Sequence, residues 1–164
     1  MQVSPIIRPA EASEIDALAQ LWHAGWQDAH AAVLPAALAR LRTLQSFADR
    51  LQGMLDDVRV IGDLDAPLGF CAVKHDELDQ LFVAPEGRGR GVAAALVADA
   101  EQRLAAHGVR TAWLACAIGN HRAARFYEKC GWTLAGTVVN RLETIEGPFD
   151  LEIWRYEKTL LPAP

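Results

Sequence analysis

The chain has 164 residues, of which 51% are hydrophobic and 23% are charged, and its formal net charge is −5 at pH 7. This length is enough for one well-buried core and short for two, so we expect a single domain over residues 1–164. The acidic balance argues against a nucleic-acid partner, which needs an excess of Lys and Arg. No apolar run approaches the roughly eighteen residues of a membrane-spanning helix, and the start lacks a signal-peptide pattern. We therefore expect a cytoplasmic protein with no membrane contact.

The elements can be predicted in chain order from periodicity and turn residues. Strand-like runs bounded by Pro, Gly and other turn residues predict strands at 3–8, 58–64, 68–74, 78–83, 109–117, 132–138 and 149–156. Apolar residues at helical spacing predict helices at 13–26, 35–55, 92–107 and 120–130. This order predicts an α/β (α+β) fold with a mixed sheet and a crossover helix between the strands ending at Val83 and starting at Val109.

The junction at 88–93, Arg-Gly-Arg-Gly-Val-Ala, follows a predicted strand and precedes a helix. A glycine-rich turn lets main-chain N–H groups converge, and a helix start adds partial positive charge. The junction therefore predicts a phosphate-binding loop.

Two other interpretations of these glycines fit less well. Gly89-x-Gly91-x-x-Ala94 satisfies a loose dinucleotide-binding fingerprint, but the next strand, within 109–120, contains no acidic residue to bind a ribose. A nucleotide P-loop is excluded because no Gly-Lys-Ser/Thr follows.

Two segments together resemble the GNAT superfamily of N-acyltransferases. Arg88, Gly91 and Ala93 match the Gln/Arg-x-x-Gly-x-Gly/Ala loop that binds the acyl-CoA pyrophosphate in that family. The segment 120–132 is similar to the family's Asn-x-x-Ala-x-x-Phe-Tyr-x-x-x-Gly-Phe segment, with Trp132 in place of the usual Phe. The resemblance extends over roughly residues 3–157.

The resemblance implies a GNAT fold, a central mixed, mostly antiparallel twisted sheet of about seven strands flanked by about four helices, with parallel strands four and five splayed. It implies acetyl-CoA as cosubstrate, an amine as acceptor and no metal. The three cysteines, Cys71, Cys116 and Cys130, agree with the last point, since none stands at metal-ligand spacing. The candidate cofactor-binding residues are Phe82, Val83, Arg88, Gly89, Arg90, Gly91, Val92, Ala93, Asn120, Arg125 and Tyr127.

Acyl transfer to an amine needs a proton acceptor, because an alkylamine of pKa ~10 is almost wholly protonated at neutral pH. Glu77 and Asp79 alternate with Leu78 and Gln80, so both carboxylates are expected on one sheet face. Either carboxylate can be the base or hold a relaying water. The alternative is that both are solvent-exposed acids.

The departing thiolate gains from a proton donor, and Tyr127 is the candidate. It lies seven residues after Asn120, so both are expected on one helix face. The resemblance implies that Tyr127 is the general acid and Asn120 a contact near the pantetheine. The alternative role of Tyr127 is packing. A backbone N–H near Phe82 or Val83 can stabilise the oxyanion.

Other residues are candidates for the acceptor site or for covalent chemistry. Trp26 and His30 share a helix face and are predicted to bind substrate, although an amphipathic core face also explains the tryptophan. Glu143 and Glu146, in the predicted connection 140–147, could attract a cationic amine or simply be solvated. Cys116 could carry the acyl group, but no histidine stands at an obvious position to activate it.

The sequence therefore predicts an N-acetyltransferase that transfers the acetyl group from acetyl-CoA to a primary amine, on a small molecule or peptide, by direct attack in a ternary complex. A catalytically silent acyl-CoA sensor and transfer of a longer acyl group are the alternatives. The oligomeric state is left open, with a homodimer among the options.

Overall fold

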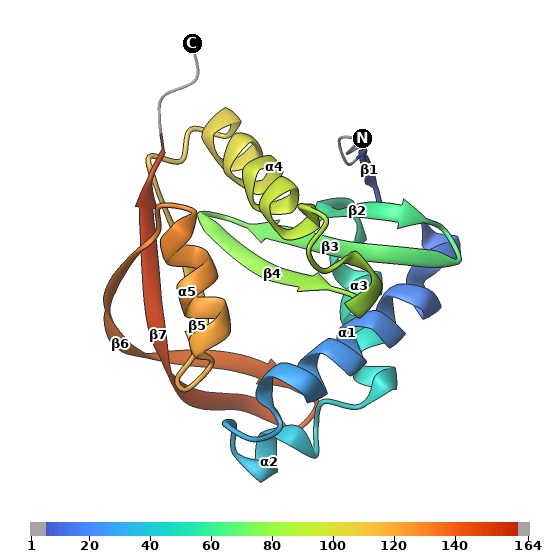
Figure 1. Ribbon diagram of the computed structural model, residues 1–164. Coiled ribbons are helices and arrows are strands. Elements are labelled where there is room, and N and C mark those ends of the chain that lie inside the picture. The colour runs from blue at the N-terminus through green and yellow to red at the C-terminus, as the bar shows by residue number, and fades with distance from the viewer. Residues whose placement is uncertain (1–5, 161–164) are drawn as a thin grey trace.

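The computed structural model describes residues 6–160 as a seven-stranded sheet with helices on both faces (Figure 1). The strands are β1 (Ile7–Pro9), β2 (Val58–Asp63), β3 (Ala66–Lys74), β4 (Glu77–Val83), β5 (Thr111–Ala117), β6 (Thr133–Thr144) and β7 (Gly147–Thr159). The α-helices are α1 (Ile15–His30), α2 (Ala36–Ala39), α3 (Leu44–Met54), α4 (Val92–Ala106) and α5 (His121–Lys129). Among these residues, no helix is both long and apolar enough to cross a bilayer.

The sheet is mixed, with the strand order β1-β2-β3-β4-β5-β7-β6. Every neighbouring pair is antiparallel except β4 and β5, which are joined by α4 and run parallel. β4 and β5 pair only where Glu77 lies opposite Trp113, and beyond that point the two strands diverge. The predicted fold class, including the splayed parallel pair, is confirmed.

The two faces of the sheet carry separate cores. Leu96, Ala100 and Leu104 of α4 pack with α5 and the inner strands on one face. Trp22 of α1 and Phe47 of α3 pack on the other face against β2, β3 and β4. The apolar stripes predicted along these helices are therefore the surfaces that cover the sheet, and α1 and α4 approach β4 from opposite sides.

The helix predicted at 35–55 is two helices rather than one. α2 is a single turn, and α3 starts afresh after Thr43, whose hydroxyl oxygen accepts a hydrogen bond from the backbone N–H of Ser46 at 3.1 Å. Such a cap favours a new helix start over continuation of the preceding turn. The prediction of one continuous helix was wrong because the leucine spacing continues across the break.

The strand ends also differ from the prediction. β6 and β7 form one long hairpin, so the predicted connection at 140–147 is mostly paired strand with a tight turn at its end. The predicted strand at 3–8 is found as β1 from Ile7, and residues 3–5 lie outside the described residues. Polar side chains along 140–144 obscured the hairpin, because a strand exposed on one face does not need an apolar pattern.

Candidate active site

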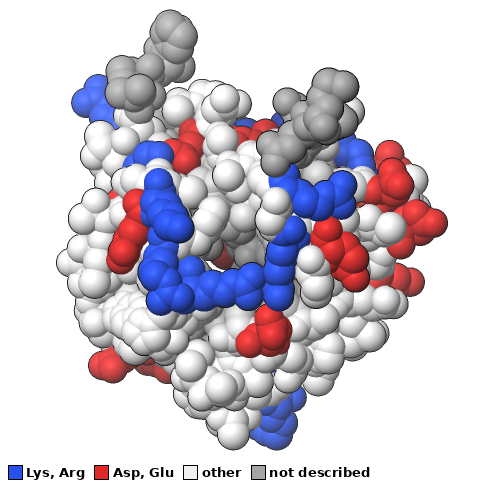
Figure 2. Space-filling view, in the orientation of Figure 1, with Lys and Arg blue, Asp and Glu red and all other residues white. Residues whose placement is uncertain are grey.

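A cavity of about 640 Å³ lies where β4 and β5 part. Its walls are the last turn of α1, β4, the loop before α4, the end of β5 and the first turns of α5. In Figure 2, Lys and Arg side chains gather around a hollow between α4 and α5. Arg88 and Arg122 line the cavity itself. The cavity therefore combines a positive rim with the main-chain groups of β4 that have no ladder partner in β5.

The structure brings most of the predicted site residues to this cavity. The predicted residues that line it are His30, Asp79, Phe82, Val83, Arg88, Gly89, Ala93, Asn120 and Tyr127. Those that do not are Trp26, Glu77, Arg90, Gly91, Val92 and Arg125. A second cavity, of about 720 Å³, adjoins at Arg88 but includes none of Asp79, Asn120 or Tyr127, so the candidate chemistry lies in the first.

The loop before α4 has the geometry of an anion cradle. Gly89 and Gly91 have φ angles of +72° and +77°, which other residues adopt only with strain, and a Cβ at either would meet no atom within 4 Å. Glycine is therefore favoured at both positions by the backbone conformation and not by a lack of room for a side chain. No side chain caps α4, whose N-cap is Gly91, so the first N–H groups of a fifteen-residue helix face outward without an intrahelical acceptor.

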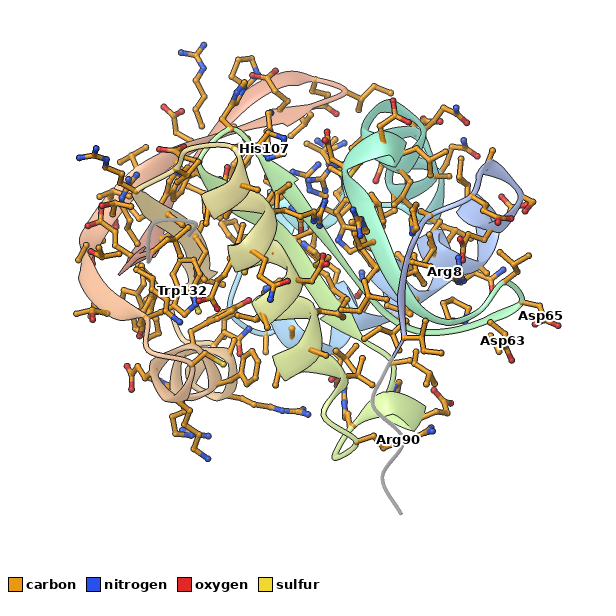
Figure 3. The ribbon with its side chains drawn as sticks, turned by 90° about the horizontal axis from the view of Figure 1, so that it is seen from above. Arg8, Asp63, Asp65, Arg90, His107 and Trp132 are labelled. Carbon is orange, nitrogen blue, oxygen red and sulfur yellow. The ribbon has the colours of Figure 1, made fainter. Side chains whose placement is uncertain are left out.

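The two arginines of the loop, Arg88 and Arg90, have different partners. Arg88 forms an ion pair with Asp28 of α1, with Nη2 2.9 Å from Oδ2. Arg90 donates to the main-chain oxygen of Glu86 at 3.3 Å and lies outside the cavity, at the end of α4 opposite His107 (Figure 3). Of these side chains, Arg88 is the one placed to meet an anion in the cavity.

Asn120 and Tyr127, seven residues apart, both face the cavity. Asn120 is the N-cap of α5, and its Oδ1 accepts a hydrogen bond from the N–H of Ala123 at 3.2 Å. The cap occupies the amide oxygen, which leaves the amide NH₂ available as a donor. The local sequence thus holds this side chain rigidly at the cavity wall.

The hydroxyl of Tyr127 makes no hydrogen bond with any residue in the range 6–160. Its ring packs against Phe126, Tyr156 and Trp132, the residue that replaces the motif's usual Phe. Burial, with a smaller contribution from Cys116, raises the pKa of Tyr127 well above its ordinary value. The phenol is therefore protonated at every physiological pH and can act as a hydrogen-bond or proton donor.

The two predicted carboxylates lie at a β-bulge. Ala72 of β3 pairs with Gln80 and the next residue, Val73, pairs with Leu78, so Asp79 has no partner in the register. The simple alternation expected along β4 is broken at this point. Asp79 lines the cavity and Glu77 does not.

Burial raises the pKa of both groups. For Glu77, burial is the largest cause and the charge of Asp79 adds to it, which brings the pKa to about 8. For Asp79, burial raises the pKa and the guanidinium of Arg50 opposes the rise. At neutral pH Glu77 therefore retains a proton that an exposed glutamate would have lost.

The predicted acceptor residues on α1 are divided between cavity and core. His30 lines the cavity with its ring 6.1 Å from that of Phe82, and its Nδ1 is buried without a partner among the described residues. Burial lowers the pKa of His30 to about 4, so the imidazole is neutral at pH 7. Trp26 is 5% exposed and packs in the core with Phe47.

Cys116 reaches the cavity, but its surroundings do not favour a nucleophile. Burial raises the pKa of this thiol to about 11, so the thiolate is scarce at neutral pH. Its closest polar contacts are two main-chain oxygens at 3.8 Å. No group of three or more His, Cys, Asp or Glu residues within 6–160 is arranged to hold a metal ion.

Several cavity residues were missed by reasoning from the sequence alone. Among them, Gln80 follows the bulge, and His121 and Arg122 open α5. The sequence prediction gave Arg125, which does not line the cavity, as a cofactor-binding residue and left out Arg122. A signal was available, since residues directly after an N-cap surround the helix start, where anions are attracted.

The glutamate of the β6–β7 turn is already neutralised. Glu146 pairs with Arg40 at 2.9 Å across the exposed surface, and this pair lowers the pKa of Glu146. The neighbouring Glu143 accepts a main-chain hydrogen bond from Nη1 of Arg42 at 3.3 Å. An attraction between Glu146 and a cationic amine is therefore weakened by its existing partner.

Comparison with known proteins identifies the family. The model of the acetyltransferase (GNAT) family matches residues 16–132, which include both motifs and the whole splayed pair. The chain belongs to this family. Uncharacterized N-acetyltransferases of Mycobacterium tuberculosis and Mycobacterium bovis are 39% identical over 66 residues, 40% of this chain. The match spans 42% of those relatives, less than half of their length.

Solved structures show the same fold in GNAT proteins. A GCN5-related N-acetyltransferase of Rhodopseudomonas palustris superposes with a TM-score of 0.75 at 23% identity, over 98% of both chains. The PaiA N-acetyltransferase of Thermoplasma acidophilum, solved in complex with coenzyme A, superposes with a TM-score of 0.66 at 18% identity. That match covers 96% of this chain and 99% of the Thermoplasma protein.

Proposed function

We propose that this GNAT protein transfers the acetyl group of acetyl-CoA directly to a primary amine within a ternary complex. The observation that carries the proposal is the meeting of an anion cradle, a tyrosine hydroxyl without a hydrogen-bond partner among the described residues and a partly buried carboxylate around one cavity. These are the three groups that amide formation from a thioester needs.

Acetyl-CoA would lie along the opening between β4 and β5. The N–H groups from Gly89 to Ala93 and the guanidinium of Arg88 would bind the pyrophosphate, while the amide NH₂ of Asn120 would contact the pantetheine. The Thermoplasma relative, solved with coenzyme A, supports the choice of cosubstrate. The positive φ angles of the loop glycines support a backbone cradle.

Asp79 would receive the amine's proton, directly or through one water. Asp79 lines the cavity and Glu77 does not, which supports Asp79 as the base. Glu77, with its pKa raised to about 8, would stay protonated beside it at neutral pH. The ammonium of the acceptor would lose a proton to the carboxylate of Asp79, and the neutral nitrogen would then attack the thioester carbon.

Tyr127 would donate to the sulfur as the tetrahedral intermediate collapses. Its unpartnered hydroxyl and its raised pKa support this role. A main-chain N–H near Phe82 or Val83 would stabilise the oxyanion, because β4 is unpaired on the β5 side there. The raised pKa of Cys116 argues for direct attack over an acyl-enzyme.

The test is a thiol-release assay with acetyl-CoA and a panel of polyamines, aminoglycosides, amino acids and peptides, with product mass confirming an acetylated amine. Release that depends on an amine supports the proposal. Calorimetric binding of acetyl-CoA without release from any amine would favour a silent acyl-CoA sensor. Faster release from a longer acyl-CoA would assign a different acyl donor.

A further inference from the structure

His30 is a polar side chain at the reaction cavity that the proposed mechanism leaves without a role. It ends α1 and lines the cavity, with its ring edge-on to that of Phe82 at 6.1 Å and to that of Trp26 at 5.4 Å. Its main-chain oxygen accepts hydrogen bonds from the N–H groups of Val33 and Leu34 at 3.0 and 2.9 Å. Both the backbone and the ring of His30 are therefore held in place.

The two ring nitrogens of His30 lie in different surroundings. Nδ1 is buried and has no hydrogen-bond partner among residues 6–160. A neutral imidazole has one N–H donor and one acceptor nitrogen, and a buried N–H without an acceptor is rare in folded proteins. The proton therefore belongs on Nε2, the nitrogen left to face the cavity. His30 thus presents a neutral N–H donor to the site.

The imidazole stays neutral through the physiological pH range. Burial lowers the pKa of His30 to about 4, although a position at the C-terminal end of a helix favours the charged ring. A protonated ring would carry a second N–H at Nδ1, where no acceptor lies within the described residues. A neutral donor costs less to bury than a cation, and it can still stabilise negative charge that develops during a reaction.

His30 and Tyr127 reach the cavity from opposite faces of the sheet. α1 packs on one face and α5 on the other, and β4 and β5 part between them (Figure 1). Two atoms of a thioester gain electron density during acyl transfer, the sulfur and the carbonyl oxygen. Tyr127 is the donor proposed for the sulfur, so the oxygen is left to donors beside Phe82, where His30 lies.

Building on the proposed acetyl transfer, we propose that His30 is a further catalytic residue, whose Nε2–H donates a hydrogen bond to the carbonyl oxygen of the acetyl group beside the main-chain N–H near Phe82. As the amine nitrogen bonds to the carbonyl carbon, the π electrons move to this oxygen, and both donors stabilise the oxyanion. Collapse restores the C=O bond and breaks the C–S bond, and the sulfur takes a proton from Tyr127. The nitrogen gives one proton to Asp79 before the attack and a second to the phenolate of Tyr127 after it. His30 keeps its own proton throughout.

The test compares His30→Leu, which removes the donor, with His30→Gln, whose amide NH₂ can replace Nε2–H. His23→Leu is the matched control, because His23 lies on the same helix, with its ring 6.0 Å from that of Phe47, and outside the cavity. Since loss of one oxyanion donor lowers kcat about 10²–10³-fold, we expect a fall of about 10²-fold in His30→Leu. KM for the amine and for acetyl-CoA should stay within about threefold. His30→Gln should lose less than about tenfold, and the control should behave as the wild type.

The melting temperature and KM separate this role from a structural one and from acceptor binding. Leu in place of a ring with an unpaired buried nitrogen should leave the melting temperature unchanged or raise it. Equal losses of kcat in both His30 variants, with a lower melting temperature in each, would assign His30 to the fold and overturn the inference. A higher KM for the amine with an unchanged kcat would overturn it as well, while acetyl transfer stands.

The infrared carbonyl band of bound acetyl-CoA, isotope-labelled at the carbonyl carbon, tests the contact without turnover. A hydrogen bond to the oxygen polarises the C=O bond and lowers its stretching frequency. We expect a lowered frequency in the wild type and in His30→Gln and a smaller shift in His30→Leu. A shift that depends on His30, in a protein that releases no thiol with any amine, would support the contact and overturn the proposed transfer. An identical band in the wild type and His30→Leu would overturn the inference.

Discussion

Tyr127→Phe isolates the proposed acid, because it removes one oxygen atom and leaves the ring packing in place. The hydroxyl has no partner among the described residues, so the free energy of unfolding should change by less than about 0.5 kcal/mol. General acid catalysis contributes about 10²–10⁴-fold, and a thiol of pKa ~8.5 leaves fairly well unaided. We therefore expect kcat to fall about 10²-fold, which corresponds to about 2.7 kcal/mol at about 1.36 kcal/mol per tenfold.

The second tyrosine supplies the control for this substitution. The hydroxyl of Tyr156 donates to Oε1 of Glu128 at 3.0 Å and lies outside the cavity. Tyr156→Phe should therefore lower the free energy of unfolding by about 1 kcal/mol and leave kcat unchanged. Thiol release gives kcat, calorimetry gives the acetyl-CoA affinity, and urea denaturation gives stability. An unchanged kcat in Tyr127→Phe, or a loss of stability as large as that of Tyr156→Phe, would refute the assignment.

Three further predictions concern the loop, the carboxylates and a buried ion pair. Gly91→Ala, at φ +77°, should destabilise the protein by about 1–2 kcal/mol and weaken coenzyme A binding. Gly53→Ala, in helix α3, is the control and should have neither effect. Equal melting temperatures for the two variants would contradict the prediction. Because Asp79 must be ionised to act as the base and burial raises its pKa, kcat/KM should rise with pH at higher pH than the ionisation of an exposed aspartate would give. Glu77→Gln should stay active and keep that rise, while Asp79→Asn should lose about 10²-fold and the rise with it. The reverse result in the pH profiles would exchange their roles. Glu14→Ala should lower the free energy of unfolding, measured by urea denaturation, by about 3 kcal/mol. The reason is that the buried carboxylate of Glu14 accepts two hydrogen bonds from Arg8, at 2.6 and 2.9 Å. A loss below about 1 kcal/mol would show that this ion pair does not stabilise the fold.

Local sequence signals were most reliable where one segment decides its own structure. The glycine loop, the helix start near Asn120 and the helical spacing of Tyr127 depend on neighbours a few residues away, and the structure has each in the expected form. The leucine spacing across 35–55 misled because capping by Thr43 outweighs a continuous apolar pattern. Periodicity reports which face is buried, and it does not report where a helix restarts.

The sequence by itself determined the resemblance to the family, through its two motifs. Short-range spacing also determined the order of the elements, apart from the break within 35–55, and the strand–loop–helix proposed as the anion cradle. Only the tertiary structure decided which carboxylate faces the cavity, because the bulge at Asp79 depends on pairing with β3. It also decided that Arg122 lines the cavity, while Arg125, which the sequence favoured, lies outside it.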